Sequence, residues 1–233
     1  MQEIFQQTIK NSVSFEGIGL HSGKICKVKL IPSDVDKGII FKRTDLSERN
    51  VITANFNNVS SAKLCTTLKN SSGIKVSTVE HLLAAFYILG VDNVTVELDN
   101  EEVPIMDGSS KDFIEILNTV GNKKLNKKRK FLKILDKVTL EDQGRTISIK
   151  PSDLSFAVEF QLNYSNNIIG KQKNSVNFNN DDLIDIYSSR TFCLYQDIEK
   201  IKKIGLAKGG SLDNAIVVDD KKIINENGLR NEK

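Results

Sequence analysis

Residues that commonly bind metal ions or form disulfides are scarce in this sequence. Its three cysteines, Cys26, Cys65 and Cys193, are scattered along the chain and include no CxxC pair. This pattern argues against a structural zinc knuckle and favours reduced thiols in a cytoplasm. Two histidines occur, His21 and His81, so any hypothesis of a metal site depends on one or both of them.

Long apolar runs are also missing. The longest, residues 82–89, is far too short to span a bilayer, and the first ten residues, MQEIFQQTIK, lack the apolar core of a signal peptide. We therefore expect a cytoplasmic protein without stable membrane insertion. The net charge of +3, from 33 basic and 30 acidic residues, is too small to favour nucleic acid as a partner. With 39% hydrophobic and 27% charged residues, the 233 residues indicate a soluble globular protein of one large or two ordinary domains.

Residues 77–86, STVEHLLAAF, predict a helix that ends near Gly90. Ser77 and Glu80 have the spacing of a capping box, which places the start of the helix at Ser77. His81 points away from the apolar stripe, and its neighbours on that face are small or apolar rather than charged. We expect the helix to be buried on most sides, with Glu80 and His81 near its positive N-terminal end. The apolar stripe comprises Val79, Leu82, Leu83, Phe86 and Leu89.

The Glu80–His81 pair has two interpretations. In the structural one, Glu80 is a cap and His81 is a hydrogen-bonded core histidine. In the functional one, His81 is a metal ligand and Glu80 is a base that takes a proton from a metal-bound water, as in the HExxH arrangement. The second histidine of that motif is absent here, so the pair alone does not decide between them.

The rest of the first half predicts strands and a second helix. Alternating apolar and polar residues at 26–30 and 94–98 are typical of strands with one face in water, and residues 39–41 predict another strand. The glycines of GIGLHSG, residues 17–23, predict a tight turn between strands. Residues 109–120 predict a helix with its apolar side chains on one face.

A basic segment, NKKLNKKRK, occupies residues 122–130. It is consistent with a nucleic-acid-binding patch or with a solvated linker. We favour the linker because no aromatic residues interleave with the basic ones, as base stacking would require. It would join a first domain at residues 1–121 to a second domain at residues 131–233.

Two sequence echoes suggest that the halves have similar folds. KLIPSD at 29–34 is matched by SIKPSD at 148–153, and GVDNVTVELD at 90–99 is matched at nearly the same spacing by SLDNAIVVDD at 211–220. We predict an α+β protein with two similar domains, each a small β-sheet layered with helices, and a ligand cleft between them. The repeat places the counterpart of the first half's closing helix at the last residues and beyond. The second domain is therefore expected to be incomplete and to leave an apolar face bare.

Five motifs occur in order along the chain: GIGLHSG, TVEHLLAA, PIMDGSS, SRTF and GGSLDNAIV. Together they resemble the UDP-3-O-acyl-N-acetylglucosamine deacetylases, zinc amidases of lipid A biosynthesis in Gram-negative bacteria. The resemblance covers essentially the whole chain and implies two similar α+β domains with the site between them. It also implies zinc as the cofactor and UDP-3-O-acyl-N-acetylglucosamine as the substrate, which loses its N-acetyl group. We expect a monomer.

The resemblance implies roles for individual residues. His81 matches the first zinc ligand, Glu80 the general base, and Thr191 the residue that stabilises the oxyanion. His21 lies in a motif near the mouth of the site and is not expected to bind the catalytic zinc. Phe192 matches a residue that contacts the substrate, and Glu159 and Phe160 lie near the position that binds uracil. Residues 192–211 resemble the insert that forms a passage for the acyl chain, and Gly210 within it is also expected to bind substrate. Ile198, Ile201 and Ile204 could line this passage, and an ordinary amphipathic helix is the alternative.

In the family, the other two zinc ligands lie on a helix of the form HKxxxD, and a later histidine is the general acid. None of these is present in the 233 residues. Two hypotheses follow. The chain is most of a zinc deacetylase whose C-terminal part is lost from the record or supplied by another chain, or it is a non-catalytic fragment that binds zinc poorly and at most binds nucleotide sugar or acyl chain. A third, RNA binding, rests only on residues 122–130.

Overall fold

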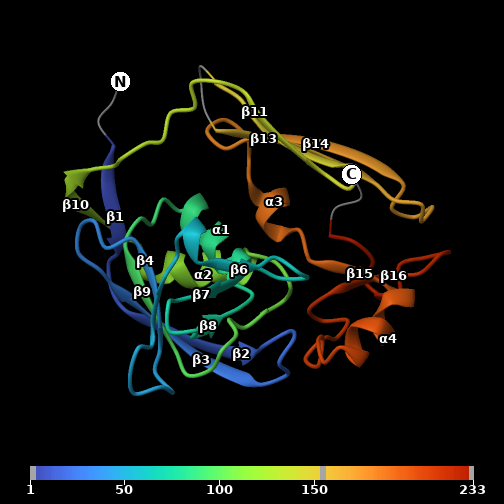
Figure 1. The fold of residues 1–233 in the computed structure, drawn as a ribbon, viewed down its shortest axis with the longest axis horizontal. Helices are drawn as coiled ribbons and strands as arrows, with labels where there is room; N and C mark the ends of the chain where they lie inside the picture. The colour runs from blue at the N-terminus through green and yellow to red at the C-terminus, as the bar shows by residue number, and fades with distance from the viewer. Residues whose placement is uncertain (1–3, 153–155, 231–233) are drawn as a thin grey trace.

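The computed structural model describes residues 4–152 and 156–230, and its first half is built on a five-stranded sheet (Figure 1). The strand order is β2-β3-β9-β4-β5. The parallel pair β4–β9 lies among otherwise antiparallel pairs. The strand bounds are β2 (Val13–Ile18), β3 (Ile25–Pro32), β4 (Ile39–Arg43), β5 (Val51–Thr53) and β9 (Val94–Leu98). The strands predicted at 26–30, 39–41 and 94–98 are confirmed, as is the turn between β2 and β3.

Two helices, α1 (Glu80–Ile88) and α2 (Lys111–Val120), cover one face of this sheet. The alternation of β3 explains why, since Cys26, Val28 and Leu30 are buried while the residues between them face water. They pack in one core with Phe86 of α1 and Phe113 of α2. Both predicted helices are therefore confirmed, and they pack against each other as well as against the sheet.

The predicted capping box is wrong. The N-cap of α1 is Val79, which makes no side-chain capping bond. Thr78 has a left-handed backbone, with φ of 56°, so the chain turns sharply before the helix begins. Ser77 is left outside the helix and donates its hydroxyl to the carbonyl of Glu101. Glu80 is the first helical residue, and its carboxylate is used elsewhere.

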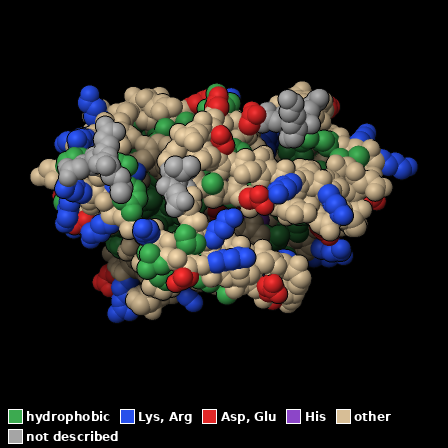
Figure 2. Space-filling model, turned by 90° about the horizontal axis from the view of Figure 1, so that it is seen from above, with side chains coloured by type: hydrophobic (Ala, Val, Ile, Leu, Met, Phe, Trp, Pro, Cys, Tyr) green, Lys and Arg blue, Asp and Glu red, His purple; other side chains and the backbone are tan. Residues whose placement is uncertain are grey.

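The predicted linker is instead largely a strand. β10 (Asn122–Lys128) pairs antiparallel with β1 (Phe5–Ile9). Lysines do not prevent this pairing, because the backbone makes the ladder bonds while the side chains stay in water. Arg129 is fixed by Asp92 at 2.8 Å. Figure 2 shows lysine and arginine side chains gathered at the left end of the molecule, the end where Figure 1 places β1 and β10.

The loop before α1 is held by one buried carboxylate, Glu102, which is 1% exposed. It accepts hydrogen bonds from the backbone N–H groups of His21 (2.8 Å) and Ser22 (2.7 Å) and from the hydroxyl of Thr78 (2.8 Å). These bonds tie the β2–β3 turn to the entry of α1. Beside this loop lie η1 (Phe56–Asn58) and a small sheet of β6 (Val59–Ser61), β7 (Thr67–Lys69) and β8 (Lys75–Val76).

The described part of the second half consists of two-stranded sheets and two short helices, so the α+β class is confirmed. Whether its fold resembles the first half stays a prediction. The hairpins are β11 (Val138–Asp142) with β12 (Arg145–Ile149) and β13 (Ala157–Asn163) with β14 (Lys171–Asn177). They are followed by α3 (Ile184–Ser188), the parallel pair β15 (Phe192–Leu194) and β16 (Ile216–Val218), and α4 (Tyr195–Lys203).

The sequence echoes fall at comparable places. In both halves an Asp-Asn pair precedes a buried strand, since Asn93 comes before β9 and Asn214 lies just before β16. Both asparagines are themselves buried. No helix of the described residues has the length and apolar character needed to cross a membrane.

One face of the β11–β12 hairpin exposes apolar side chains within the described residues, and whether the second domain lacks a closing helix stays a prediction. Val138 lies opposite Ile149 and Leu140 opposite Ile147, so all four side chains share one face of the β11–β12 hairpin. They are 47% to 70% exposed. The hairpins run along the top of Figure 1, away from the five-stranded sheet, and Figure 2 looks down on that side.

Replacing Glu102 should destabilise the first half strongly. Glu102→Ala leaves two backbone N–H groups and one hydroxyl without their acceptor, and we expect the free energy of unfolding to fall by about 3 kcal/mol or more. Urea unfolding followed by circular dichroism measures this. The matched control is Glu101→Ala, whose exposed carboxylate lies 3.8 Å from Lys24 and should change stability by less than about 1 kcal/mol. Equal effects of the two substitutions would contradict the role given to Glu102.

Candidate active site

A pocket of about 610 Å³ lies between the two halves of the chain. The first half contributes the N-terminus of α1 and the loop before β7, and the second half contributes the segment around β15 and part of α4. Its lining residues are Leu64, Glu80, His81, Tyr164, Ser189, Arg190, Thr191, Phe192, Cys193, Leu194, Asp197 and Ile201. Acidic, basic, hydroxyl and aromatic groups therefore meet in one hollow.

Glu80 and His81 open α1 at the wall of this pocket. The backbone N–H of Thr66 donates to Oε2 of Glu80 at 3.0 Å, which fixes the direction of the carboxylate. Burial lowers the pKa of His81 below its usual value, although the negative charges of Glu80 and Asp107 act in the opposite direction. His81 is therefore a neutral imidazole near pH 7, the form that can accept a proton or bind a metal ion.

The second half reaches the pocket through a backbone hydrogen bond. The N–H of Thr191 donates to the carbonyl of Gly108 at 2.8 Å, and the N–H of Ile216 donates to the carbonyl of Thr191 at 2.9 Å. Gly108 has φ of 88°, and a Cβ there would lie 2.2 Å from the carbonyl oxygen of Asn214. Glycine is required because both the backbone conformation and the close approach exclude a side chain.

Charged groups reinforce the same junction. Arg230 forms an ion pair with Asp107 at 2.6 Å and donates to the carbonyl of Ser188 at 3.2 Å. Arg190 donates to the carbonyl of Asp107 at 2.7 Å. Burial alone would raise the pKa of Asp107, but hydrogen bonds from Ser109 and Arg230 outweigh it and lower that pKa. The carboxylate of Asp107 thus stays ionised and binds Arg230, while the backbone carbonyl of the same residue binds Arg190.

An aromatic wall closes one side of the pocket. Phe192 of β15 stacks edge-on against Tyr164, with 5.8 Å between the ring centres. Leu194 follows on the same strand, and Ile201 of α4 also lines the hollow. This wall offers apolar surface to a ligand, while Glu80, His81 and Thr191 offer polar groups.

Comparisons with known proteins show which family the chain belongs to. The model of the UDP-3-O-acyl N-acetylglycosamine deacetylase family matches residues 6–233. The chain belongs to this deacetylase family. It is 41% identical over 227 residues to the UDP-3-O-acyl-N-acetylglucosamine deacetylase of Geotalea uraniireducens, covering 97% of this chain and 73% of the relative. The same-named proteins of Pasteurella multocida and Pseudomonas entomophila are each 42% identical, covering 97% and 98% of this chain and 75% and 76% of the relatives.

The structure brings together four of the site residues that the deacetylase motifs implied: Glu80, His81, Thr191 and Phe192. The other four lie elsewhere. Ile198 is on α4 but does not line the pocket. Ile201, on the same helix, does. Gly210 lies in a turn, where its backbone N–H donates a hydrogen bond to the carbonyl of Ala207 at 3.3 Å.

Glu159 and Phe160 are on β13, where Glu159 pairs with Lys173 at 3.3 Å and Phe160 is 44% exposed. The substrate contacts of Ile198, Gly210, Glu159 and Phe160 stay predictions.

Several lining residues of the pocket were missed by sequence reasoning. Tyr164 and Leu64 reach it through folding, and no local motif singles them out. Arg190 offered a usable signal, because it lies in the motif SRTF next to Thr191, which was identified.

The described residues do not fit a complete catalytic zinc site. Such a site takes three protein ligands and keeps one position open. Within residues 4–152 and 156–230, no group of three histidine, cysteine, aspartate or glutamate side chains is arranged to hold a metal ion. His81 is the imidazole at this pocket, with Glu80 beside it, so the site supplies at most part of the coordination that zinc needs.

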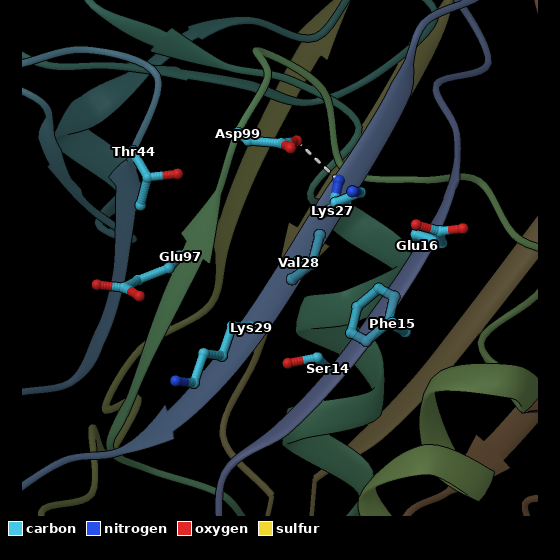
Figure 3. A pocket seen from close by; sticks show the side chains of 9 residues that line it. All are labelled: Ser14, Phe15, Glu16, Lys27, Val28, Lys29, Thr44, Glu97 and Asp99. Atoms are coloured by element: carbon cyan, nitrogen blue, oxygen red, sulfur yellow. Dashed lines mark hydrogen bonds between the residues drawn. The ribbon is translucent and has the colours of Figure 1, made fainter.

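A second hollow of about 490 Å³ lies on the outer face of the five-stranded sheet (Figure 3). Its lysines lie opposite acidic residues of neighbouring strands, with Lys27 opposite Glu16 and Lys29 opposite Glu97. The backbone N–H of Lys27 donates to Asp99 at 2.8 Å, as the dashed line in Figure 3 shows, and Glu97 binds Lys42 at 2.9 Å. Histidine and cysteine are absent from its lining residues. We interpret it as a solvated sheet surface.

Substituting Gly108 should weaken the junction that carries Thr191. Gly108→Ala places a Cβ against the carbonyl of Asn214 and strains the backbone, so we expect a loss of at least about 2 kcal/mol in unfolding free energy. Amide hydrogen exchange at Thr191 should also accelerate. Gly210→Ala is the control, because its nearest neighbouring atom would lie 3.4 Å from the new Cβ. Unchanged exchange at Thr191 in Gly108→Ala would show that this contact is not what positions the segment.

Proposed function

We propose that this chain acts on UDP-3-O-acyl-N-acetylglucosamine, the compound that appears in the names of its relatives. We propose that the chain takes part in removing the N-acetyl group of this compound in lipid A synthesis. The observation that carries the proposal is the meeting of Glu80 and Thr191, from opposite halves of the chain, in one pocket of a deacetylase-family protein. We also propose that the protein works in the cytoplasm as a monomer without a nucleic-acid partner.

Amide hydrolysis needs a base for the attacking water and a donor for the oxyanion that forms. Glu80 is suited to the first task because the Thr66 N–H holds one carboxylate oxygen and leaves the other to accept the proton of water. Thr191 is suited to the second. Its backbone N–H and C=O are used in the junction, and its hydroxyl makes no hydrogen bond within the described residues.

The apolar wall of the pocket suits the acyl chain of this substrate. Phe192, Tyr164 and Ile201 present adjoining apolar surface next to the polar groups at Glu80 and Thr191. A ligand with an acetamide near an acyl chain would place each part against a matching surface. The uracil contacts proposed for Glu159 and Phe160 lie outside this wall.

Zinc dependence follows from the family resemblance and stays a proposal. His81 is the residue that would bind zinc, and the metal would supply an acidified water and a positive charge for the oxyanion. The described residues do not complete such a site. This observation favours a second candidate function, in which the isolated chain binds the nucleotide sugar or its acyl chain without turning it over.

Substrate binding tests the pocket assignment directly. We expect isothermal titration of the chain with UDP-3-O-acyl-N-acetylglucosamine to give saturable binding, weakened on the order of tenfold in Phe192→Ala, because burying one aromatic side chain contributes about 1.5–3 kcal/mol. The matched control is Tyr195→Ala, since Tyr195 neighbours the wall but is 58% exposed and does not line the pocket. Absence of binding, or equal weakening by both substitutions, would overturn the assignment.

Metal content and turnover separate the two candidate functions. We expect the purified chain to contain far less than one zinc per molecule and to release no acetate from the substrate, because one imidazole holds zinc weakly. Elemental analysis and an acetate assay with added zinc measure both. Stoichiometric zinc, or acetate release that disappears in Glu80→Gln, would refute the binding-only candidate.

A further inference from the structure

Positive charge is concentrated in one stretch of the chain. Residues 122–137, NKKLNKKRKFLKILDK, which we call the lysine-rich segment, contain eight basic residues and one aspartate and so carry a net charge of +7. The whole chain carries +3, so the residues outside this segment together carry −4. The lysine-rich segment is therefore a local concentration of positive charge on a protein that is otherwise slightly acidic.

The structure holds the first part of this segment on a fixed frame. β10 pairs with β1, and the backbone N–H of Arg129 extends the pairing by donating to the carbonyl of Ile4 at 2.8 Å. The chain then runs along the upper side of Figure 1 to β11, and Figure 2 looks down on that side. All lysines of the segment are exposed, so the segment presents its charge to the solvent.

Acidic neighbours neutralise a minority of these cations. Lys127 contacts the carboxylate of Asp36, and Arg129 binds Asp92 at 2.8 Å. Four lysines of the segment form no ion pair within the parts of the chain that the structure describes: Lys123, Lys130, Lys133 and Lys137. These lysines are available to an anionic partner.

Exposed apolar side chains lie beside these cations. Phe131 is 67% exposed and Leu132 is 89% exposed, and Lys130 and Lys133 flank them in sequence. Ile4, whose carbonyl is bonded at the start of this stretch, is 47% exposed. Lysines next to large apolar side chains match the surface of an anionic bilayer, where the ammonium groups meet the headgroups and the apolar groups reach the acyl boundary.

The residue types favour a lipid surface over nucleic acid. Arginine is the residue best suited to bidentate contacts with phosphates and bases, and the one arginine of the segment, Arg129, is already bound to Asp92. Base stacking needs a free aromatic face, whereas Lys124 covers the ring of Phe5, with its Nζ 3.8 Å from the ring centre. Leu132, the most exposed apolar side chain here, has no aromatic face.

We propose that the lysine-rich segment, together with Ile4, is a docking surface for anionic lipid bilayers. The lysines attract the headgroups, and Phe131 and Leu132 enter the boundary of the acyl chains. Binding of this kind is reversible and needs no membrane-spanning helix. None of these residues lines the pocket that contains Glu80, so the proposal does not depend on the proposed deacetylase function.

Flotation of the whole chain with phosphatidylglycerol vesicles tests the contribution of charge. We expect binding that is at least about tenfold stronger than to phosphatidylcholine vesicles and that is lost as salt is raised, because headgroup attraction is electrostatic and screened. Substituting both Lys130→Glu and Lys133→Glu should weaken binding at least about tenfold. The matched control, Lys63→Glu with Lys171→Glu, makes the same charge change at two exposed lysines elsewhere and should weaken binding less than about threefold.

Equal binding to the two kinds of vesicle would overturn the proposal, as would equal weakening by the two pairs of substitutions.

Leu132→Ser tests the apolar contribution. We expect at least about threefold weaker binding to phosphatidylglycerol vesicles, because this side chain leaves water on docking. The control is Phe56→Ser, which removes a side chain that is 82% exposed on η1 and outside the lysine-rich segment. Both positions are exposed, so circular dichroism should show no loss of fold. Unchanged vesicle binding in Leu132→Ser would contradict a lipid partner.

Single-stranded RNA of mixed sequence tests the competing partner. We expect any retention of RNA by the chain to be the same in Leu132→Ser as in the native chain, because an aliphatic side chain does not stack on bases. Retention of RNA without binding to phosphatidylglycerol vesicles would overturn the proposal in favour of nucleic acid. These outcomes are independent of those of the substrate-binding and zinc experiments.

Discussion

The backbone hydrogen bond from Thr191 to Gly108 is the contact on which the pocket depends. It attaches the second half to a loop of the first half whose glycine tolerates no side chain. Through it the hydroxyl of Thr191 lies in the same hollow as Glu80, which is more than a hundred residues earlier in the chain. The ion pair between Asp107 and Arg230 supports the same junction from outside.

The two halves differ in how they are held. The first has a continuous core in which the sheet, α1 and α2 bury one another, and Glu102 secures the loop between them. The second has a small cluster around Ile169, Ile216 and Val218, and its hairpins expose apolar side chains. Polar junction contacts therefore contribute much of the order at the pocket on that side, where apolar burial contributes little.

Much of the first half was predictable because its strands alternate cleanly, as Cys26, Val28 and Leu30 show. The start of α1 was not, because the left-handed backbone at Thr78 removes Ser77 from the helix and is invisible to a spacing rule. The strand β10 was missed for another reason. Its lysines suggest a solvated linker, whereas its structure comes from backbone pairing with β1, distant in sequence.

The site was predictable where it coincides with motifs. Glu80, His81, Thr191 and Phe192 meet in the pocket, and each belongs to a short sequence signature. Tyr164 reaches the same place only through long-range folding, which no local pattern records.

The pairing of β1 with β10 has a consequence for synthesis on the ribosome. The strand made first finds its partner only when residues 122–128 have emerged, so the first half cannot close before then. At 5–20 residues per second this takes on the order of ten seconds, during which the edge of β1 has no strand beside it. After β1 and β10 have paired, the two ends of the first half lie next to each other. The second half then follows a unit that is already folded.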